Sequence, residues 1–203
     1  MGQWPIDVQA LQCAALTAPG RKWLRGPRGT GFVYVHPDFL PLLRPAVADH
    51  FSRPWQKENM WTYRGDARRL ELSESSLALR LGLGSAVDAW SKLGITNVQG
   101  QIQQRATWLR EALGRLSAIK VHVPSGAHLS GIVTFECESH TNTVIQTALQ
   151  QRGIEAALCP AAFTPWDMAH KHQESVLRFS PGYDTGWESL ELAVDFLADW
   201  LAR

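Results

Sequence analysis

Apolar residues recur at helical spacing in the middle of the chain. Residues 77–93 (LALRLGLGSAVDAWSKL) keep this spacing despite their glycines, which predicts a helix with Gly94 as its C-cap residue. A second, long amphipathic helix is predicted from about Asn97 to Leu116. Its apolar side consists of Val98, Ile102, Trp108, Leu109, Leu113 and Leu116.

After this long helix, the apolar positions no longer follow helical spacing and instead form short runs typical of β-strands. Four strands are predicted, at residues 119–123, 130–137, 154–159 and 175–180. A helix is expected over residues 140–153, with Thr141 or Asn142 near its cap and Gly153 at its end. The last helix is expected to begin at a T-x-x-E capping box, Thr185 to Glu188.

The N-terminal part shows fewer β-type runs. Residues 7–16 have apolar positions every three or four residues, which predicts two or three helical turns. Residues 31–36 (GFVYVH) predict a strand closed by Pro37, and residues 37–45 a short helix. Residues 46–68 are irregular and aromatic, and they predict a loop that covers or joins another part of the molecule.

These patterns predict the α/β fold class. The C-terminal 85 or so residues supply about four strands and two helices, whereas the first 90 or so supply too little sheet for a self-contained α/β core. We therefore expect an incomplete N-terminal domain over residues 1–96, a connecting helix over 97–116 and a complete small domain over 117–203.

Composition narrows the class of protein. A formal net charge of +1 disfavours a general nucleic-acid or membrane-surface binder. No apolar run is long enough to span a bilayer, and the N-terminus lacks the basic and apolar regions of a signal peptide. Three widely spaced cysteines favour a reducing cytoplasm over a disulfide framework or a zinc site. Nine tryptophans are many for 203 residues, and they indicate packing, an interface or a partner's site.

Three separated motifs resemble those of one enzyme family. GRKWLRGPRGTGFVYV (20–35) resembles the lysine segment of the class V aminotransferase family, pyridoxal-phosphate (PLP) enzymes of fold type I. ARRLELSESSLALRLGLGSAV (67–87) resembles the R-R-F-E segment and the helix after it, and LRFSPGYDTGWESLE (177–191) the R-x-S-P-x-Y-N-T-x-x-E motif. The order of the motifs is that of the family, and the lysine segment resembles its carbon–sulfur lyase and epimerase branch. The resemblance implies the C-terminal part of the large domain plus the small domain.

The resemblance also implies roles for individual residues. Lys22 takes the position of the lysine that forms the Schiff base with PLP and moves the Cα proton, so it must be partly deprotonated near neutral pH. Arg21 stands where many relatives have histidine. The resemblance implies that its positive charge lies near the cofactor phosphate or favours the neutral form of the lysine amine. Arg178 matches the arginine that holds the substrate α-carboxylate. Ser75 or Ser76 would replace the threonine that, in relatives, faces the phosphate in the neighbouring subunit.

Some residues of the family pattern have no counterpart. The aspartate that pairs with the pyridine nitrogen and the glutamine near the ring oxygen lie upstream of the matched part, and Gln3 stands too late to be that glutamine. Glu74 falls in the phosphate-facing segment, where it would repel a phosphate. Without its pyridinium partner, PLP stabilises a carbanion poorly.

Other candidate groups are weaker. Cys159 lacks the sequence context of a desulfurase cysteine, so a packed thiol is favoured, and His170 and His172 are expected to be solvated rather than metal ligands. Arg68 and Arg69 are expected either to bind phosphate or to form ion pairs near Glu71. Core or interface packing is favoured over a substrate mouth for Trp55, Trp61 and Tyr63.

Two functions remain open from the sequence. The first is a PLP-dependent enzyme acting on an amino acid, by Cα deprotonation followed by β-elimination, transamination or epimerisation. It would work as a homodimer or with a complementary N-terminal-half chain. The second is a non-catalytic remnant that serves as a dimerisation or scaffolding module. A nucleotide-binding glycine loop is disfavoured, because no P-loop or Rossmann fingerprint is present.

Overall fold

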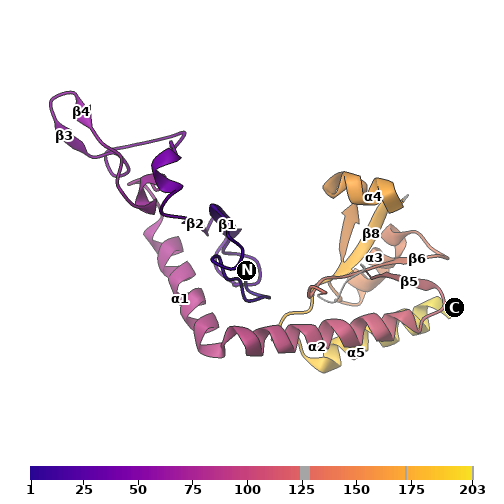
Figure 1. Ribbon diagram of the computed structural model, residues 1–203. Coiled ribbons are helices and arrows are strands. Elements are labelled where there is room, and N and C mark those ends of the chain that lie inside the picture. The colour runs from indigo at the N-terminus through magenta and orange to yellow at the C-terminus, as the bar shows by residue number, and fades with distance from the viewer. Residues whose placement is uncertain (124–128, 172, 203) are drawn as a thin grey trace. The chain divides into compact units, whose positions relative to one another are not determined.

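The computed structural model describes residues 1–123, 129–171 and 173–202. The chain divides into two compact units, Met1–Ile95 and Thr96–Arg203 (Figure 1). The finer domain boundaries expected from the sequence stay a prediction.

The C-terminal unit is built around a four-stranded sheet with strand order β5-β6-β8-β7, in which each neighbouring pair is antiparallel. The strands are β5 (Ile119–His122), β6 (Val133–Cys137), β7 (Ala157–Pro160) and β8 (Ser175–Phe179). The helices are α2 (Ile95–Gly114), α3 (Asn142–Gln151), α4 (Pro165–Lys171) and α5 (Trp187–Leu201). The four predicted strands are thereby confirmed to within a few residues.

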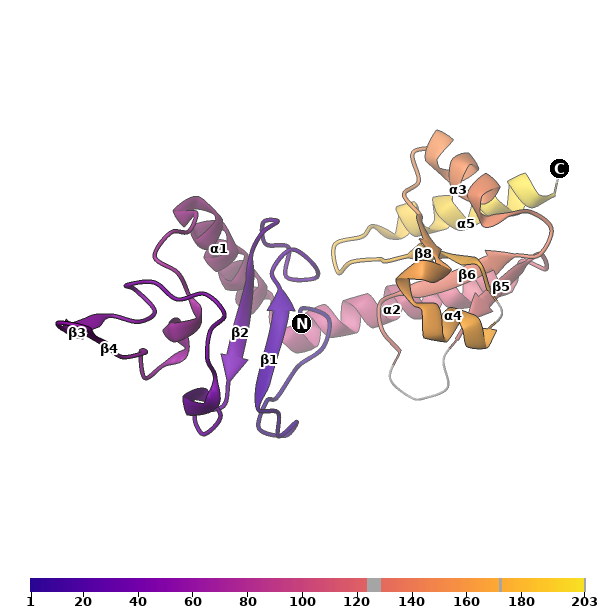
Figure 2. The same cartoon turned by 90° about the horizontal axis from the view of Figure 1, so that it is seen from above.

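One face of this sheet forms the core. Because side chains alternate along a strand, Val133 and Phe135 of β6 and Leu177 and Phe179 of β8 lie on the same face, and all four are buried. Apolar residues of α2, α3 and α5 join them in one cluster. The ring centroids of Phe135 and Phe179 lie 5.1 Å apart. In Figure 2, α3 and α5 lie on one side of the sheet and α4 on the other.

Two features of this unit differ from what the sequence predicted. Helix α4, with Pro165 as its first residue, is not among the predicted elements. The T-x-x-E capping box does not form, since the N-cap residue of α5 is Gly186 and no side chain caps the helix. The Thr185 hydroxyl instead accepts a hydrogen bond of 2.8 Å from the Gly182 N–H, which closes the turn before the helix.

The N-terminal unit contains two small sheets and one long helix. β1 (Ala15–Pro19) pairs antiparallel with β2 (Gly31–Val35), and β3 (Trp55–Lys57) with β4 (Met60–Trp61). Two 3₁₀ turns, η1 (Leu40–Leu42) and η2 (Ala67–Leu70), precede α1 (Leu77–Leu93). Helix α1 and its Gly94 C-cap, with φ of +78°, are confirmed.

The helix expected over residues 7–16 does not form. The Asp7 carboxylate accepts hydrogen bonds from the Gln9 and Ala10 N–H groups, which favours a local turn over a continued helix. Gln12 then adopts a positive φ of 50°, and from Ala15 onward the chain pairs with β2. Long-range strand pairing overrides the helical spacing here.

Few apolar side chains of the N-terminal unit are buried. Leu24 and Leu40 are its only buried hydrophobic side chains among the described residues. No residue of α1 is buried although most of them are apolar, and Leu77 and Leu81 are 68% and 65% exposed. A two-stranded sheet is marginally stable by itself. The apolar faces of this unit are therefore surfaces that fit a further packing partner. Among the described residues, no helix is long and apolar enough to cross a membrane.

Glycines let the loop between β1 and β2 pack directly against α1. A Cβ atom on Gly82 of α1 would lie 2.7 Å from Pro27 Cγ, and one on Gly26 would lie 2.9 Å from Leu83 Cδ1. A Cβ on Gly31 would lie 2.8 Å from the Ala18 carbonyl oxygen. That oxygen belongs to the backbone and has little freedom to move.

Asp49 organises the irregular segment before α1. Its carboxylate accepts hydrogen bonds from the N–H groups of Phe51, Ser52 and Ser73 and from both serine hydroxyls. These hydrogen bonds, led by that from the Ser52 backbone, hold the pKa of Asp49 well below its ordinary value. One carboxylate thereby joins two stretches that are 24 residues apart.

Replacing glycine by alanine should have opposite effects at Gly31 and Gly84. Gly31→Ala should lower the free energy of unfolding by about 1–3 kcal/mol, because its Cβ meets the Ala18 carbonyl. Gly84→Ala should raise it by roughly 0.5–1 kcal/mol, because its Cβ in α1 meets nothing within 4 Å. Urea unfolding of the full chain measures both values. Equal effects of the two substitutions would contradict the close approach of the strands.

The stability supplied by Asp49 should depend on pH. Because the folded-state pKa is depressed, this contribution is present above about pH 4, the unfolded pKa, and is lost as the pH falls below it. Asp49→Asn should lower the thermal midpoint at neutral pH and flatten its decline below about pH 4. Asp88→Asn, at an exposed position of α1, is the control and should change neither. An unchanged acid profile in Asp49→Asn would count against this role.

Candidate functional site

The lysine segment forms the loop between β1 and β2. The Gly20 N–H donates to the Thr30 carbonyl and the Gly26 N–H to the Gly20 carbonyl, both at 2.9 Å. The Arg25 N–H donates to the Lys22 carbonyl, also at 2.9 Å, and Arg25 takes a positive φ of 62°. Residues 20–26 thus make a closed turn with a defined backbone, and Lys22 stands within it.

Both basic residues of this turn reach solvent. The side chains of Arg21 and Lys22 are exposed, whereas Leu24, two residues on, is buried. Within the part of the chain that the structure describes, the Lys22 side chain has no hydrogen-bond or ion-pair partner. The amine is therefore accessible to a ligand, and the N-terminal unit does not bury it.

Ser75 and Ser76 lie at the N-terminus of α1. Ser76 is the N-cap residue and its hydroxyl accepts the Leu79 N–H at 3.4 Å, while the Ser75 hydroxyl accepts from Arg80 Nη1 at 3.4 Å. Both line a pocket of about 810 Å³ together with Gly29–Gly31 of the lysine loop. Neither Arg21 nor Lys22 lines this pocket, so this chain's fold brings the serines to the glycine loop but not to the lysine.

Arg178 lies in the C-terminal unit, on the sheet face opposite the core. It follows the buried Leu177 in β8, and its register neighbours are Thr134 of β6 and Ala157 of β7. It lines a pocket of about 380 Å³ between this face and the α4 region. Its Nε atom is buried and has no hydrogen-bond partner in the described part of the chain. An unpaired guanidinium N–H in a pocket is suited to bind an anionic oxygen.

Besides Cys159, which the sequence marked as a candidate, the Arg178 pocket contains groups that the sequence did not single out. His122 lies 3.0 Å from the Gln173 amide and 3.7 Å from a Glu136 carboxylate oxygen. Cys159 lines the same pocket. The remaining lining residues are Ile132, Thr134, Phe163, Thr164, Asp167, Met168 and Val176. Strand alternation places His122 in one row with Thr134 and Arg178, and this pattern was available in the sequence.

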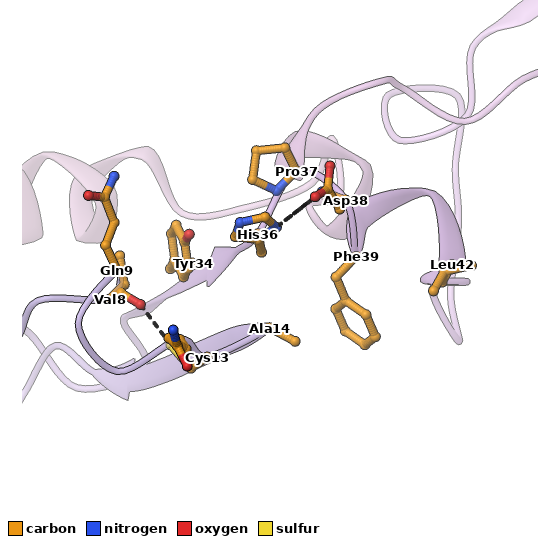
Figure 3. A pocket seen from close by; sticks show the side chains of 11 residues that line it. Val8, Gln9, Cys13, Ala14, Tyr34, His36, Pro37, Asp38, Phe39 and Leu42 are labelled. Atoms are coloured by element: carbon orange, nitrogen blue, oxygen red, sulfur yellow. Dashed lines mark hydrogen bonds and ion pairs between the residues drawn. The ribbon is translucent and has the colours of Figure 1, made fainter.

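A second pocket absent from the sequence predictions opens beside the N-terminal end of β1. Its volume is about 870 Å³, and its lining includes Cys13, Tyr34, His36, Asp38 and Phe39 (Figure 3). His36 Nδ1 accepts the Asp38 N–H at 3.3 Å. Within the described ranges, no three His, Cys, Asp or Glu side chains gather to hold a metal ion.

The other candidates are placed as follows. Arg68 pairs with Asp66 rather than Glu71, and this contact lowers the pKa of Asp66 and raises that of Arg68. Glu71 pairs instead with Arg80. Trp55 and Trp61 are 69% and 45% exposed and thus outside the core, and interface packing of these residues stays a prediction. His170 is exposed on α4, and His172 lies outside the described residues.

The sequences of known proteins match this chain over most of its length. A cysteine desulfurase of Serratia proteamaculans is 28% identical over 150 residues, which are 73% of this chain and 36% of that protein. An isopenicillin N epimerase of Amycolatopsis lactamdurans is 29% identical over 135 residues, 64% of this chain and 34% of that protein. The chain thus spans about a third of the length of these curated relatives.

Solved structures share the fold. The apo structure of a cysteine desulfurase from Thermococcus onnurineus NA1 matches with a TM-score of 0.91 at 16% identity, over 99% of this chain and 50% of that one. A structure of C-DES with glycine covalently linked to its PLP cofactor matches with a TM-score of 0.81 at 23% identity, over 98% of this chain and 49% of that one.

The family assignment rests on the whole length of the match. The lysine loop, the segment before α1 and strand β8 with its arginine are the three motifs that the sequence offered. The family model for class V aminotransferases covers them together, over residues 1–192. The chain therefore belongs to the class V aminotransferase family of PLP-dependent proteins.

Proposed function

We propose that this chain is the lysine-bearing part of a PLP-dependent enzyme that acts on an amino acid. One observation carries the proposal: a family member retains an accessible lysine in the loop between β1 and β2 and an arginine with an unpaired, buried N–H in β8. A structural remnant has no need to keep either group. Relatives that include a desulfurase and an epimerase support amino-acid chemistry of this kind.

The residues present fit part of a PLP site. Lys22 offers an accessible amine on a turn with a defined backbone. Ser75 and Ser76 offer hydroxyl donors of the kind that bind a phosphate, although Glu74 lines the same pocket and opposes an anion. No described carboxylate forms an ion pair with Lys22, and the ring-holding residues of the family lie outside the matched part. The residues present therefore fit the parts of the site that supply the lysine, bind the phosphate and bind the substrate carboxylate. They do not include the part that holds the PLP ring.

Each of these parts of the site has a distinct role. Bound PLP supplies the electron sink that stabilises negative charge at the substrate Cα. Lys22 accepts the Cα proton and returns it, because its amine is the accessible base of the loop. Arg178 holds the substrate carboxylate through its planar guanidinium edge, which fixes the substrate's orientation. The three reactions differ after this step: in epimerisation the proton returns to Cα, in transamination it goes to the carbon across the imine nitrogen, and in elimination a substituent on Cβ leaves with its bonding electrons.

We further propose that a second polypeptide completes the site, either another copy or a chain that supplies the other half of the fold. The separation of Ser75 and Ser76 from Lys22 supports this, because the family pattern places that segment against a neighbouring subunit's phosphate. The unburied α1 helix supports it too. The alternative is a non-catalytic dimerisation or scaffolding module, which the exposed apolar residues of α1 also fit.

Trapping of PLP should identify the lysine. The full chain mixed with PLP should develop a yellow absorbance band, and borohydride reduction with peptide mapping should place the label on Lys22. Lys22→Ala should remove the band, whereas Lys92→Ala, at an exposed position of α1, should keep it. Label spread over surface lysines, with the band unchanged in Lys22→Ala, would favour the non-catalytic module.

Substitution of Arg178 should weaken amino-acid binding without removing PLP. Loss of a charge-assisted hydrogen bond to a carboxylate should raise the apparent Kd about 10- to 100-fold in Arg178→Gln. The measurement is the spectral change of the PLP-loaded protein during amino-acid titration. Arg115→Gln, an exposed arginine after α2, should bind like the unmodified protein. Unchanged affinity in Arg178→Gln would assign the carboxylate to another group.

A further inference from the structure

A fourth pocket lies beside the β3–β4 hairpin, in the segment that the sequence marked as irregular and aromatic. Its volume is about 360 Å³. It is lined by Ala48, Asp49, His50, Arg53, Trp55 and Trp61. None of the residues assigned to the PLP site, namely Arg21, Lys22, Ser75, Ser76 and Arg178, belongs to this lining. The pocket is therefore available for a role that the proposed function does not use.

The guanidinium of Arg53 is held by aromatic rings. Its central carbon lies 4.8 Å from the Trp61 ring centroid and 5.0 Å from that of Tyr63. Stacking of this kind covers the faces of the guanidinium and leaves its N–H edge to bind other groups. The Arg53 Nε atom is buried and, over residues 1–123, 129–171 and 173–202, has no hydrogen-bond partner.

The acidic residue in the pocket does not neutralise Arg53. Asp49 and Arg53 form no ion pair, because the Asp49 carboxylate accepts the hydrogen bonds of Ser52 and Ser73. Because the buried Nε atom is closed to solvent, a carboxylate in the pocket would reach Arg53 through its terminal Nη groups, which form no hydrogen bond or ion pair with the described residues. The pocket thus contains an arginine that no described carboxylate neutralises.

The open side of the pocket is aromatic. The Trp55 and Trp61 rings have centroids 6.5 Å apart at an interplanar angle of 39°, and both side chains remain largely exposed. Exposed tryptophans next to a charged group are typical of binding surfaces. The rings offer an apolar wall to a planar group, and the volume is at the lower end of the range for small-molecule pockets.

We propose that this pocket binds a small aromatic carboxylate. The carboxylate pairs with the N–H edge of Arg53, and the ring of the ligand packs on the exposed indoles of Trp55 and Trp61. The small volume favours a single-ring compound over a macromolecule. This binding site goes beyond the PLP site and does not depend on it.

The test uses benzoate as the probe and its neutral analogue benzamide as the matched ligand. Binding to the full chain is followed by NMR of the tryptophan indole N–H signals, assigned with Trp55→Phe and Trp61→Phe. Benzoate should shift the Trp55 and Trp61 signals in a saturable way, and benzamide should bind at least tenfold more weakly. Arg53→Gln should weaken benzoate at least tenfold, and Arg44→Gln, an exposed arginine of the same unit, should not.

Several outcomes would overturn the proposal. Equal binding of benzoate and benzamide would remove the role of charge, and this comparison needs no variant that could fail to fold. Equal effects of benzoate and inorganic phosphate in the unmodified chain would remove the role of the rings. Self-association that protects Trp55 and Trp61 and is lost in Trp55→Leu, with Trp166→Leu of α4 as the control, would assign the surface to a second copy.

Discussion

Burial of one face of the four-stranded sheet under α2, α3 and α5 is the contact on which the C-terminal unit depends. Because side chains alternate along β6 and β8, fixing Phe135 and Leu177 in the core forces Thr134 and Arg178 to the opposite face. The Arg178 pocket is thus a consequence of core packing. A shift of one residue in the register of β8 would bury the arginine and expose the core.

The N-terminal unit is held together by a different kind of contact. Its described residues bury few apolar side chains, and it is organised by polar and backbone contacts instead: the Asp49 hydrogen bonds, arginines stacked on aromatic rings, and glycines that admit close approach to α1. Such contacts define a conformation but add little free energy compared with a core. This unit therefore presents an accessible Lys22 and the exposed apolar residues of α1, as the proposed completion of the site by a second polypeptide requires.

Two of the arginines, one in each unit, have a buried side-chain nitrogen without a hydrogen-bond partner among the described residues. Arg178 on β8 and Arg53 beside β3 each have a buried Nε without a partner in the described structure. Both residues line a pocket, and Arg53 is in addition stacked on the rings of Trp61 and Tyr63. Protein interiors rarely leave such donors unpaired, so each marks a position where an anionic ligand would be bound favourably.

The sequence by itself determined the elements whose signals are local. Periodicity specified α1 and α2, glycines marked helix ends at Gly94 and Gly153, and β-type runs located the strands of the C-terminal sheet. Three motifs in order identified the family and, by their resemblance to it, marked Lys22 and Arg178 as candidate site residues. Tertiary structure decided what depends on distant partners: residues 15–19 became a strand because β2 pairs with them, and Thr185 turned to Gly182 instead of capping α5. It also decided that Arg53 has no ion pair with Asp49, since the stacking rings and the groups that donate to the Asp49 carboxylate come together only when the chain folds.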